Sequence, residues 1–286
     1  SSCDLPQALA DELDLAVLPL HVLIGEHTYA NYLDGREIGF KEFYDKLRDG
    51  ERATTSAVNV SEFTAVMEQK LKEGLDILFI GFSSGLSTTY QSGAIACDEL
   101  REKYPERRLI AIDSLCASLG EGLLVMRAAD CRREGMGIEE TYKTLRALRH
   151  RMAQIFTVDD LRYLRRTGRL SNLEAAVGTV LQIKPLLKGD PQGKIVCFAK
   201  LRGRQRAVEA IAKRYEELVV DAQEQTVGIA HADCGPDAQI LASLLRRSSK
   251  PPKSILMVDY EPVTGSHVGP GALALFFLSD ENVRNI

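Results

Sequence analysis

Serine and threonine hydroxyls gather at one junction of this sequence, in the stretch LDILFIGFSSGLSTTYQS at residues 75–92. A hydroxyl both donates and accepts hydrogen bonds, so a cluster of them suits the polar head of a small ligand. The apolar run at residues 77–82 predicts a strand buried on both faces of a parallel sheet, and residues at helical spacing follow the hydroxyls. In an open α/β sheet such a junction faces the ligand crevice, and the helix N-terminus offers unpaired N–H groups to an anion.

Two further segments carry polar side chains of the same kind. ATTSAVN at residues 53–59 predicts a second hydroxyl-rich loop, followed by a helix that Asn59 and Glu62 begin as a capping box. GSHVGPG at residues 265–271 predicts a third loop, which holds His267 among small residues. Helix capping alone explains one hydroxyl-rich loop, and a loop histidine without a role is the simplest interpretation of His267. Three such segments at strand ends favour a ligand site.

A serine hydrolase is the first alternative, because the pentapeptide around Ser83 matches the GxSxG nucleophile elbow. Asp259 and His267 follow in the order that α/β-hydrolases use for their acid and base. The hydroxyls of Ser87 and Thr88, however, predict a helix that begins several residues after Ser83, whereas an elbow serine lies directly on the turn into its helix. No HGGG-type oxyanion segment precedes Ser83 either. We therefore expect that Ser83 is not a nucleophile, and a ligand-free interaction module remains the third hypothesis.

Composition argues against several classes of protein and partner. The chain has 286 residues, 45% of them hydrophobic, which is enough for the cores of two domains, and no run of about 18 apolar residues predicts a membrane span. A net charge of −4 without aromatic residues among basic ones argues against nucleic acid, and neither nucleotide motif, GxxxxGK[ST] or GxGxxG, occurs. The six cysteines are scattered, so we expect no metal site, cofactor or disulfide framework. The acidic first residues lack a signal-peptide pattern, and we expect a cytoplasmic protein.

The order of elements and the distribution of charge predict an α/β protein of two domains with a ligand cleft between them. Residues 1–155 carry 18 Lys and Arg against 25 Asp and Glu, and their repeating strand, loop and helix predict a wound, mostly parallel sheet. Residues 156–286 carry 18 against 15, and their hairpin and helices predict a mixed sheet. This positive second half suits an anionic group or an acidic partner, although ordinary solvated charge explains it equally well.

The remaining elements follow from hydrophobic periodicity and from helix caps. In the first domain we expect strands at residues 16–24 and 109–112, and helices at 40–47, through Arg132 and at 138–151. In the second we expect a helix that begins at Asp159 and ends at Gly168, hairpin strands at 186–188 and 195–200, a helix from RGRQR to about Val220, a strand at 227–230, a helix at 237–247, a strand at 255–258 and an apolar run at 272–278.

A set of short motifs, taken together and in order, resembles the DegV family over essentially the whole chain. The motifs are TTS at 54–56, SSGLSTTYQS at 83–92, DS at 113–114, DDLRYLRRTGRL at 159–170, IKPLL at 183–187 and GSHVGPGAL at 265–273. Two positions depart from the family pattern. Ala57 and Val58 stand where Gln-Pro usually follows TS, and Thr88 stands where Gly usually follows LS.

The resemblance implies a bacterial two-domain protein that binds one long-chain fatty acid, similar to palmitate or oleate, between its domains. It also implies that the protein is not an enzyme by itself, but the acyl-carrying subunit of a fatty acid kinase. A separate ATP-dependent kinase protein would then convert the presented carboxylate into an acyl phosphate. Burial of a sixteen-carbon tail contributes on the order of 10 kcal/mol, at roughly 0.8 kcal/mol per methylene, before the costs of association.

We expect two groups of site residues. Hydroxyls and an imidazole would bind the carboxylate without a salt bridge, which leaves it available for reaction; these residues are Thr55, Ser56, Ser84, Ser87 and His267. Arginines suit contact with the kinase or its phosphoryl group; these are Arg169, Arg202 and Arg204. A solvated arginine face is the alternative interpretation of the second group.

Overall fold

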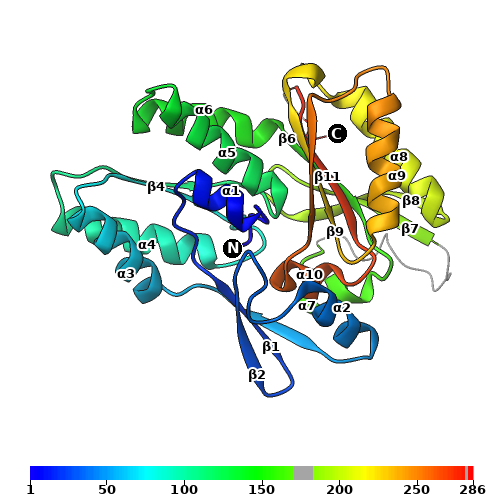
Figure 1. The fold of residues 1–286 in the computed structure, drawn as a ribbon, viewed down its shortest axis with the longest axis horizontal. Coiled ribbons are helices and arrows are strands. Elements are labelled where there is room, and N and C mark those ends of the chain that lie inside the picture. Colours follow the sequence, from blue (N-terminus) through cyan, green and yellow to red (C-terminus); the bar gives the residue numbers. More distant parts are fainter. Residues whose placement is uncertain (171–182, 281–282, 286) are drawn as a thin grey trace.

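The chain folds into two α/β parts that lie side by side, as expected for the predicted fold class (Figure 1). The structure is a computed structural model and describes residues 1–170, 183–280 and 283–285. In Figure 1 the helices α3 to α6 lie at the left, and the larger sheet with α8 and α9 lies at the right.

The first part contains a three-stranded antiparallel sheet in the order β2-β1-β3 and a parallel pair, β4-β5. Its elements are α1 (Gln7–Glu12), β1 (Leu20–Ile24), β2 (His27–Asn31), α2 (Phe40–Arg48), β3 (Ala53–Ser56), α3 (Val60–Lys72), β4 (Ile77–Gly81), α4 (Thr89–Lys103), β5 (Leu109–Asp113), α5 (Leu119–Arg133) and α6 (Ile138–Arg151). The parallel portion is smaller than predicted, and β4 is half-buried for most of its length rather than buried on both faces.

The second part is built on one mixed sheet in the order β10-β9-β11-β6-β7-β8. Its elements are β6 (Met152–Thr157), α7 (Arg162–Thr167), β7 (Ile183–Gly189), β8 (Ile195–Arg202), α8 (Arg204–Leu218), the 3-10 helix η1 (Ala222–Glu224), β9 (Thr226–His231), α9 (Gly235–Arg247), β10 (Ser254–Asp259), α10 (Pro262–Val268) and β11 (Leu273–Leu278). The predicted hairpin is confirmed, because β7 and β8 pair antiparallel. The predicted boundary at residue 155 falls inside β6, and we propose that the first domain ends just before Met152.

Several predicted helix signals are confirmed, and others are wrong in detail. Asn59 and Glu62 form the capping box of α3, and Gly168 ends α7 in the left-handed conformation. Asp159 does not begin α7: the carboxylate of Asp160 accepts the N–H of Arg162 instead. The early strand begins only at Leu20, not at residue 16.

Two segments predicted as loops are regular elements. Residues 53–56 form β3, because their β-branched side chains suit a strand and their backbone pairs with β1. Residues 262–268 form α10, because Pro262 suits the first helical position and the Glu261 carboxylate accepts the N–H groups of Val263 and Thr264. His267 therefore lies in the last turn of a short helix rather than in a loop.

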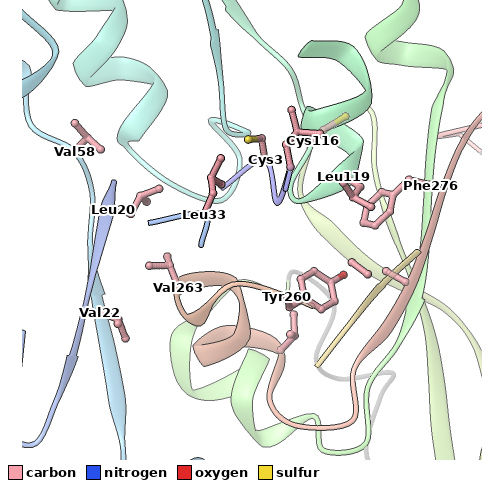
Figure 2. Close-up of a cluster of buried hydrophobic side chains, with 14 of the residues drawn as sticks. Cys3, Leu20, Val22, Leu33, Val58, Cys116, Leu119, Tyr260, Val263 and Phe276 are labelled. Atoms are coloured by element: carbon pink, nitrogen blue, oxygen red, sulfur yellow. The ribbon is translucent and has the colours of Figure 1, made fainter. Parts of the chain in front are cut away.

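A hydrophobic core joins the two parts. Figure 2 shows Leu20 and Cys116 of the first part facing Val263, Tyr260 and Phe276 of the second, all in one cluster of buried side chains. A second cluster fills the space between the large sheet and its helices, and it includes residues of α8, α9 and β11. The first cluster holds α10 against the first part of the chain, and this contact positions the site.

Helix α10 packs closely against α2. The Tyr44 hydroxyl of α2 donates a hydrogen bond to the Tyr260 carbonyl over 2.8 Å. A Cβ atom at Gly265 would lie 2.4 Å from the same hydroxyl oxygen, so no larger residue fits there without movement. Glycine at this position allows the two helices to approach.

Candidate functional site

A cavity of about 390 Å³ lies between the two parts of the chain. This volume is in the range of small-molecule sites. Its wall contains all five residues predicted to bind a carboxylate, which are Thr55, Ser56, Ser84, Ser87 and His267. The three hydroxyl and histidine segments, far apart in the sequence, therefore meet at one cavity.

One end of the cavity is polar and centres on His267. Its Nε2 atom lies 3.0 Å from Oγ1 of Thr55, which is on β3 in the other part of the chain. The second ring nitrogen, Nδ1, is buried and has no hydrogen-bond partner among the described residues, and the same holds for Oγ1 of Thr264. This end therefore retains hydrogen-bonding capacity that the described part of the chain does not use.

The ring of His267 is held neutral. Burial lowers its pKa to about 4, and the nearby cations Arg169 and Arg166 act in the same direction. A neutral imidazole donates one hydrogen bond and accepts another, so it binds a carboxylate by hydrogen bonding without a full opposite charge.

The loop after β4 supplies the other hydroxyls, and Asp113 at the end of β5 fixes its backbone. The Asp113 carboxylate accepts the N–H of Ser84 over 3.2 Å and that of Leu115 over 2.9 Å. The Ser87 hydroxyl accepts the N–H of Thr89 at the start of α4. Ser87 therefore bonds the first residue of α4 without being its N-cap residue, which is Thr88, and it also borders the cavity.

Apolar side chains line much of the remaining wall, and none of them was predicted from the sequence as a site residue. They come from both parts of the chain and include Leu20, Phe82, Leu86, Phe156, Leu164, Tyr260, Val268 and Phe276. Phe156 and Phe276 lie on the neighbouring strands β6 and β11. Their alternation with residues of the opposite sheet face was the available signal, but it does not distinguish a cavity wall from an ordinary core.

The three predicted arginines occupy different environments. Arg169 borders the cavity, and its guanidinium donates to the carbonyls of Leu86 and Thr167. Arg202 is exposed at the end of β8. Arg204 is paired with Asp237 at 2.8 Å and with Asp159 at 3.4 Å. A role of these residues in partner contact stays a prediction.

The residues of the serine hydrolase hypothesis each have another partner. The Ser83 side chain is fully buried and donates to the Gly193 carbonyl over 2.8 Å, while it accepts the N–H of Gly85. Asp259 pairs with His231 at 3.2 Å rather than with His267. Ser83 therefore ties two loops together and, unlike Ser84, is not part of the cavity wall.

The described residues form neither a metal-binding cluster nor a helix that could span a membrane. No group of three or more histidine, cysteine, aspartate or glutamate side chains there is arranged to hold a metal ion. None of the helices described is both long enough and apolar enough to cross a bilayer.

Comparisons with known proteins extend over almost the whole chain. The sequence model of the DegV family, described as a family of uncharacterised proteins, matches residues 1–280. A DegV domain-containing protein of Clostridium perfringens is 40% identical over 281 residues, covering 98% of this chain and 96% of the relative.

Solved structures of the same family have the same fold. A DegV family protein from Thermus thermophilus, described by its fatty acid binding, superposes with a TM-score of 0.89 at 29% identity and covers 98% of this chain and 97% of its own. DegV from Bacillus subtilis, a fatty acid binding protein, gives 0.84 at 28% identity with the same coverage. The resemblance found in the sequence motifs is confirmed, and the chain belongs to the DegV family.

Proposed function

We propose that this protein binds one long-chain fatty acid in the cavity and presents its carboxylate to a separate ATP-dependent kinase, which forms the acyl phosphate. The observation that carries the proposal is a single cavity with a hydroxyl and imidazole end and a largely apolar wall. Family members that are described as fatty acid binding proteins support the ligand class.

The polar end suits a carboxylate. Hydroxyls of Thr55 and Ser84 and the neutral ring of His267 supply donors without placing a cation directly on the carboxylate. A carboxylate held in this way keeps its charge and its nucleophilic oxygen. A carboxylate oxygen can therefore attack the terminal phosphorus of ATP held by a partner protein, which forms the acyl phosphate and breaks the bond to the β-phosphate oxygen, so that ADP leaves.

The apolar wall suits an acyl chain. Each buried methylene contributes roughly 0.8 kcal/mol, so a chain of sixteen or eighteen carbons supplies most of the binding free energy. The polar end then fixes orientation rather than affinity. This division explains why neutral hydrogen bonds suffice at the head.

Arg169 is the proposed contact with the kinase or its phosphoryl group. It borders the polar end, where its side chain is half-buried and is anchored to the carbonyls of Leu86 and Thr167. An arginine fixed in this position can bind phosphate oxygens through the rest of its planar guanidinium.

Native mass spectrometry of protein purified from bacteria tests the ligand. We expect an adduct with the mass of a C16 to C18 fatty acid, because a tightly held acid survives purification. Added palmitate or oleate should raise the melting temperature of the delipidated protein. Absence of both the adduct and the thermal shift would refute the proposal.

Phosphorylation by a fatty acid kinase protein tests presentation. The loaded protein with ATP and this kinase should yield acyl phosphate, and neither protein should do so alone. Arg169→Ala should retain acid binding and lose most of the product, whereas the matched variant Arg202→Ala, at an exposed strand end, should retain both. Labelling of Ser83 by a fluorophosphonate, together with esterase turnover, would favour the hydrolase hypothesis instead.

A further inference from the structure

Helix α10 carries His267 in its last turn, and it is too short to be stable by itself. Its seven residues span about 10 Å, whereas isolated helices of fewer than about twelve residues are marginal in water. The position of the His267 ring therefore depends on the contacts that hold the two ends of this helix. At the C-terminal end, this contact is the approach of His267 Nε2 to Oγ1 of Thr55 over 3.0 Å.

The N-terminal end of α10 is held by the buried carboxylate of Glu261. One carboxylate oxygen accepts the N–H of Thr264 over 2.7 Å, and the other accepts the N–H of Val263. The second oxygen also accepts a hydrogen bond of 2.6 Å from Nδ2 of Asn31, the last residue of β2. Glu261 is 1% exposed and Asn31 is 2% exposed, so water does not compete for these bonds. Glu261 therefore caps the helix and also ties it to the first part of the chain.

Both ends of α10 are tied to the same face of the three-stranded sheet. Asn31 lies opposite Leu20 of β1, and Thr55 lies opposite Val22 of β1. Residues opposite each other, and residues two apart along one strand, point to the same face of a sheet, so Asn31 and Thr55 share a face. Leu20 and Val22 belong to the same hydrophobic cluster as Val263 of α10 (Figure 2). The helix thus packs on this face and is bonded to the sheet at both ends.

The bond between Asn31 and Glu261 fixes the direction of the helix. A helix bonded at one end can pivot about that bond, whereas a second bond at the other end prevents the movement. The packing of Gly265 against Tyr44 restrains the middle of α10. Hydrogen bonds of charged groups are also roughly twice as strong as neutral ones. Without this bond the turn that carries His267 can shift, and hydrogen bonds weaken steeply when their geometry changes.

We propose that Glu261 and Asn31 are positioning residues for His267, which place the imidazole that binds the carboxylate of the acid. The inference rests on the proposed function and adds two residues that act on the head group through another residue. Neither Glu261 nor Asn31 is among the described residues that border the cavity. Their substitution should therefore weaken binding of a carboxylate and leave the wall around the acyl chain unchanged.

The first test compares palmitate with hexadecanol, which has the same chain length and no carboxylate, by displacement of a fluorescent fatty acid from the delipidated full chain. Glu261→Gln replaces one carboxylate oxygen by an NH₂ group, so the side chain can no longer accept from Asn31 and from both N–H groups of α10. It should weaken palmitate binding about tenfold, the effect of one lost hydrogen bond, and hexadecanol binding less than twofold. Asn31→Ala, which leaves the helix cap intact, should act in the same direction.

Rescue by an exchange of donor and acceptor is the second test. Asn31→Asp alone places two carboxylates together and should weaken palmitate binding more than hexadecanol binding. In the double variant Asn31→Asp and Glu261→Gln, the glutamine amide can donate to the introduced carboxylate. Palmitate affinity should then recover to within about threefold of the wild-type value. A double variant no better than either single variant would contradict the proposal.

Coupling between Glu261 and Thr55 is the third test, since the two residues act on His267 from opposite ends of α10. Thr55→Ala should weaken palmitate binding in the wild type. It should have little further effect in Glu261→Gln, because the contact between Thr55 and His267 is already weakened there. Effects that simply add would mean that Glu261 does not act through His267.

The matched control is Glu62→Gln, the same change in the first turn of α3, where the Glu62 carboxylate accepts the N–H of Asn59 over 2.8 Å. No residue of α3 borders the cavity, so both ligands should bind as in the wild type. If Glu261→Gln and Asn31→Ala bind palmitate as the wild type does, or lose equal factors for palmitate and hexadecanol, the inference is wrong and the proposed function stands. If the wild-type protein binds no palmitate, the proposed function itself fails. Because Asn31→Ala removes the other partner of the same bond, misfolding of Glu261→Gln does not remove the test.

Discussion

The two ends of the cavity are built by different means. The polar end combines short segments from distant parts of the chain, namely β3, the loop after β4 and the last turn of α10. The apolar part of the wall, called the deep end here, takes side chains from both parts of the chain, among them Phe156 and Phe276 on the neighbouring strands β6 and β11. Hydrogen bonds fix the first end, whereas packing fixes most of the second. If the proposed function holds, orientation of the acid and affinity for it should therefore be separable.

Loss of packing at the deep end should have the largest effect, and it should lower the free energy of unfolding. Phe276 is 3% exposed and packs against α5, so Phe276→Ala should lower the free energy of unfolding by about 3–5 kcal/mol. Urea denaturation measures this change. Phe198→Ala, at a half-buried position of β8, is the matched control and should cost less. Equal losses in the two variants would contradict the assignment of Phe276 to a tightly packed wall.

Protonation of His267 at the polar end should have the second largest effect, and it acts on the free energy of unfolding. The folded-state pKa of His267, about 4, lies below the unfolded value of about 6.5, so the unfolded chain binds the proton more tightly between these values. The contribution of the neutral ring is therefore complete above about pH 6.5 and is lost as the pH falls towards 4, by at most about 3 kcal/mol. Urea denaturation from pH 4 to pH 7 should show a steeper pH dependence for the wild type than for His267→Gln. Parallel curves would contradict the depressed pKa.

Removal of hydroxyls from the polar end should have a moderate effect on ligand affinity. The double variant Thr55→Ala and Ser84→Ala should weaken binding of a fatty acid by about 1–3 kcal/mol, the range of one or two lost hydrogen bonds. Titration with palmitate measures the change. Titration with hexadecanol, the fatty alcohol of the same chain length, tests whether the loss is specific to the carboxylate. Ser83→Ala is the neighbouring control. It should lower stability, because its hydroxyl bonds Gly193, more than it lowers affinity.

Changes outside both ends should have the smallest effect. Arg202 is exposed at the end of β8 and does not border the cavity. Arg202→Ala should change both the free energy of unfolding and the affinity for fatty acid by less than about 0.5 kcal/mol. A larger loss of acid affinity would indicate that the site extends to this strand end.

The sequence predicted the polar end better than the deep end, for a physical reason. Hydroxyls and a histidine among glycines are unusual enough to be noticed, and the capping box of Asn59 and Glu62 is a local signal that needs no tertiary information. The apolar wall uses Phe156 and Phe276, which have the same pattern as core residues.

Errors in the predicted elements have the same origin. Residues 53–56 were expected in a loop because they are polar, but pairing with β1 makes them a strand. α10 was expected as a loop because its sequence contains glycine, but the Glu261 cap and Pro262 start a helix there. The ion pairs of Arg204 with Asp159 and Asp237 also follow only from the fold, and its contact with a partner stays a prediction.

The close packing of α10 against α2 has a consequence for recombination between related genes. Gly265 leaves just enough room for Tyr44, and His267 two residues later reaches Thr55 on β3. Recombination between two family members at the junction of their domains would exchange α10 without its partners on α2 and β3. Such chimeras should lose the polar end of the cavity. Natural exchange within the family is therefore expected to move these three segments together, or to preserve their residues on both sides of the crossover.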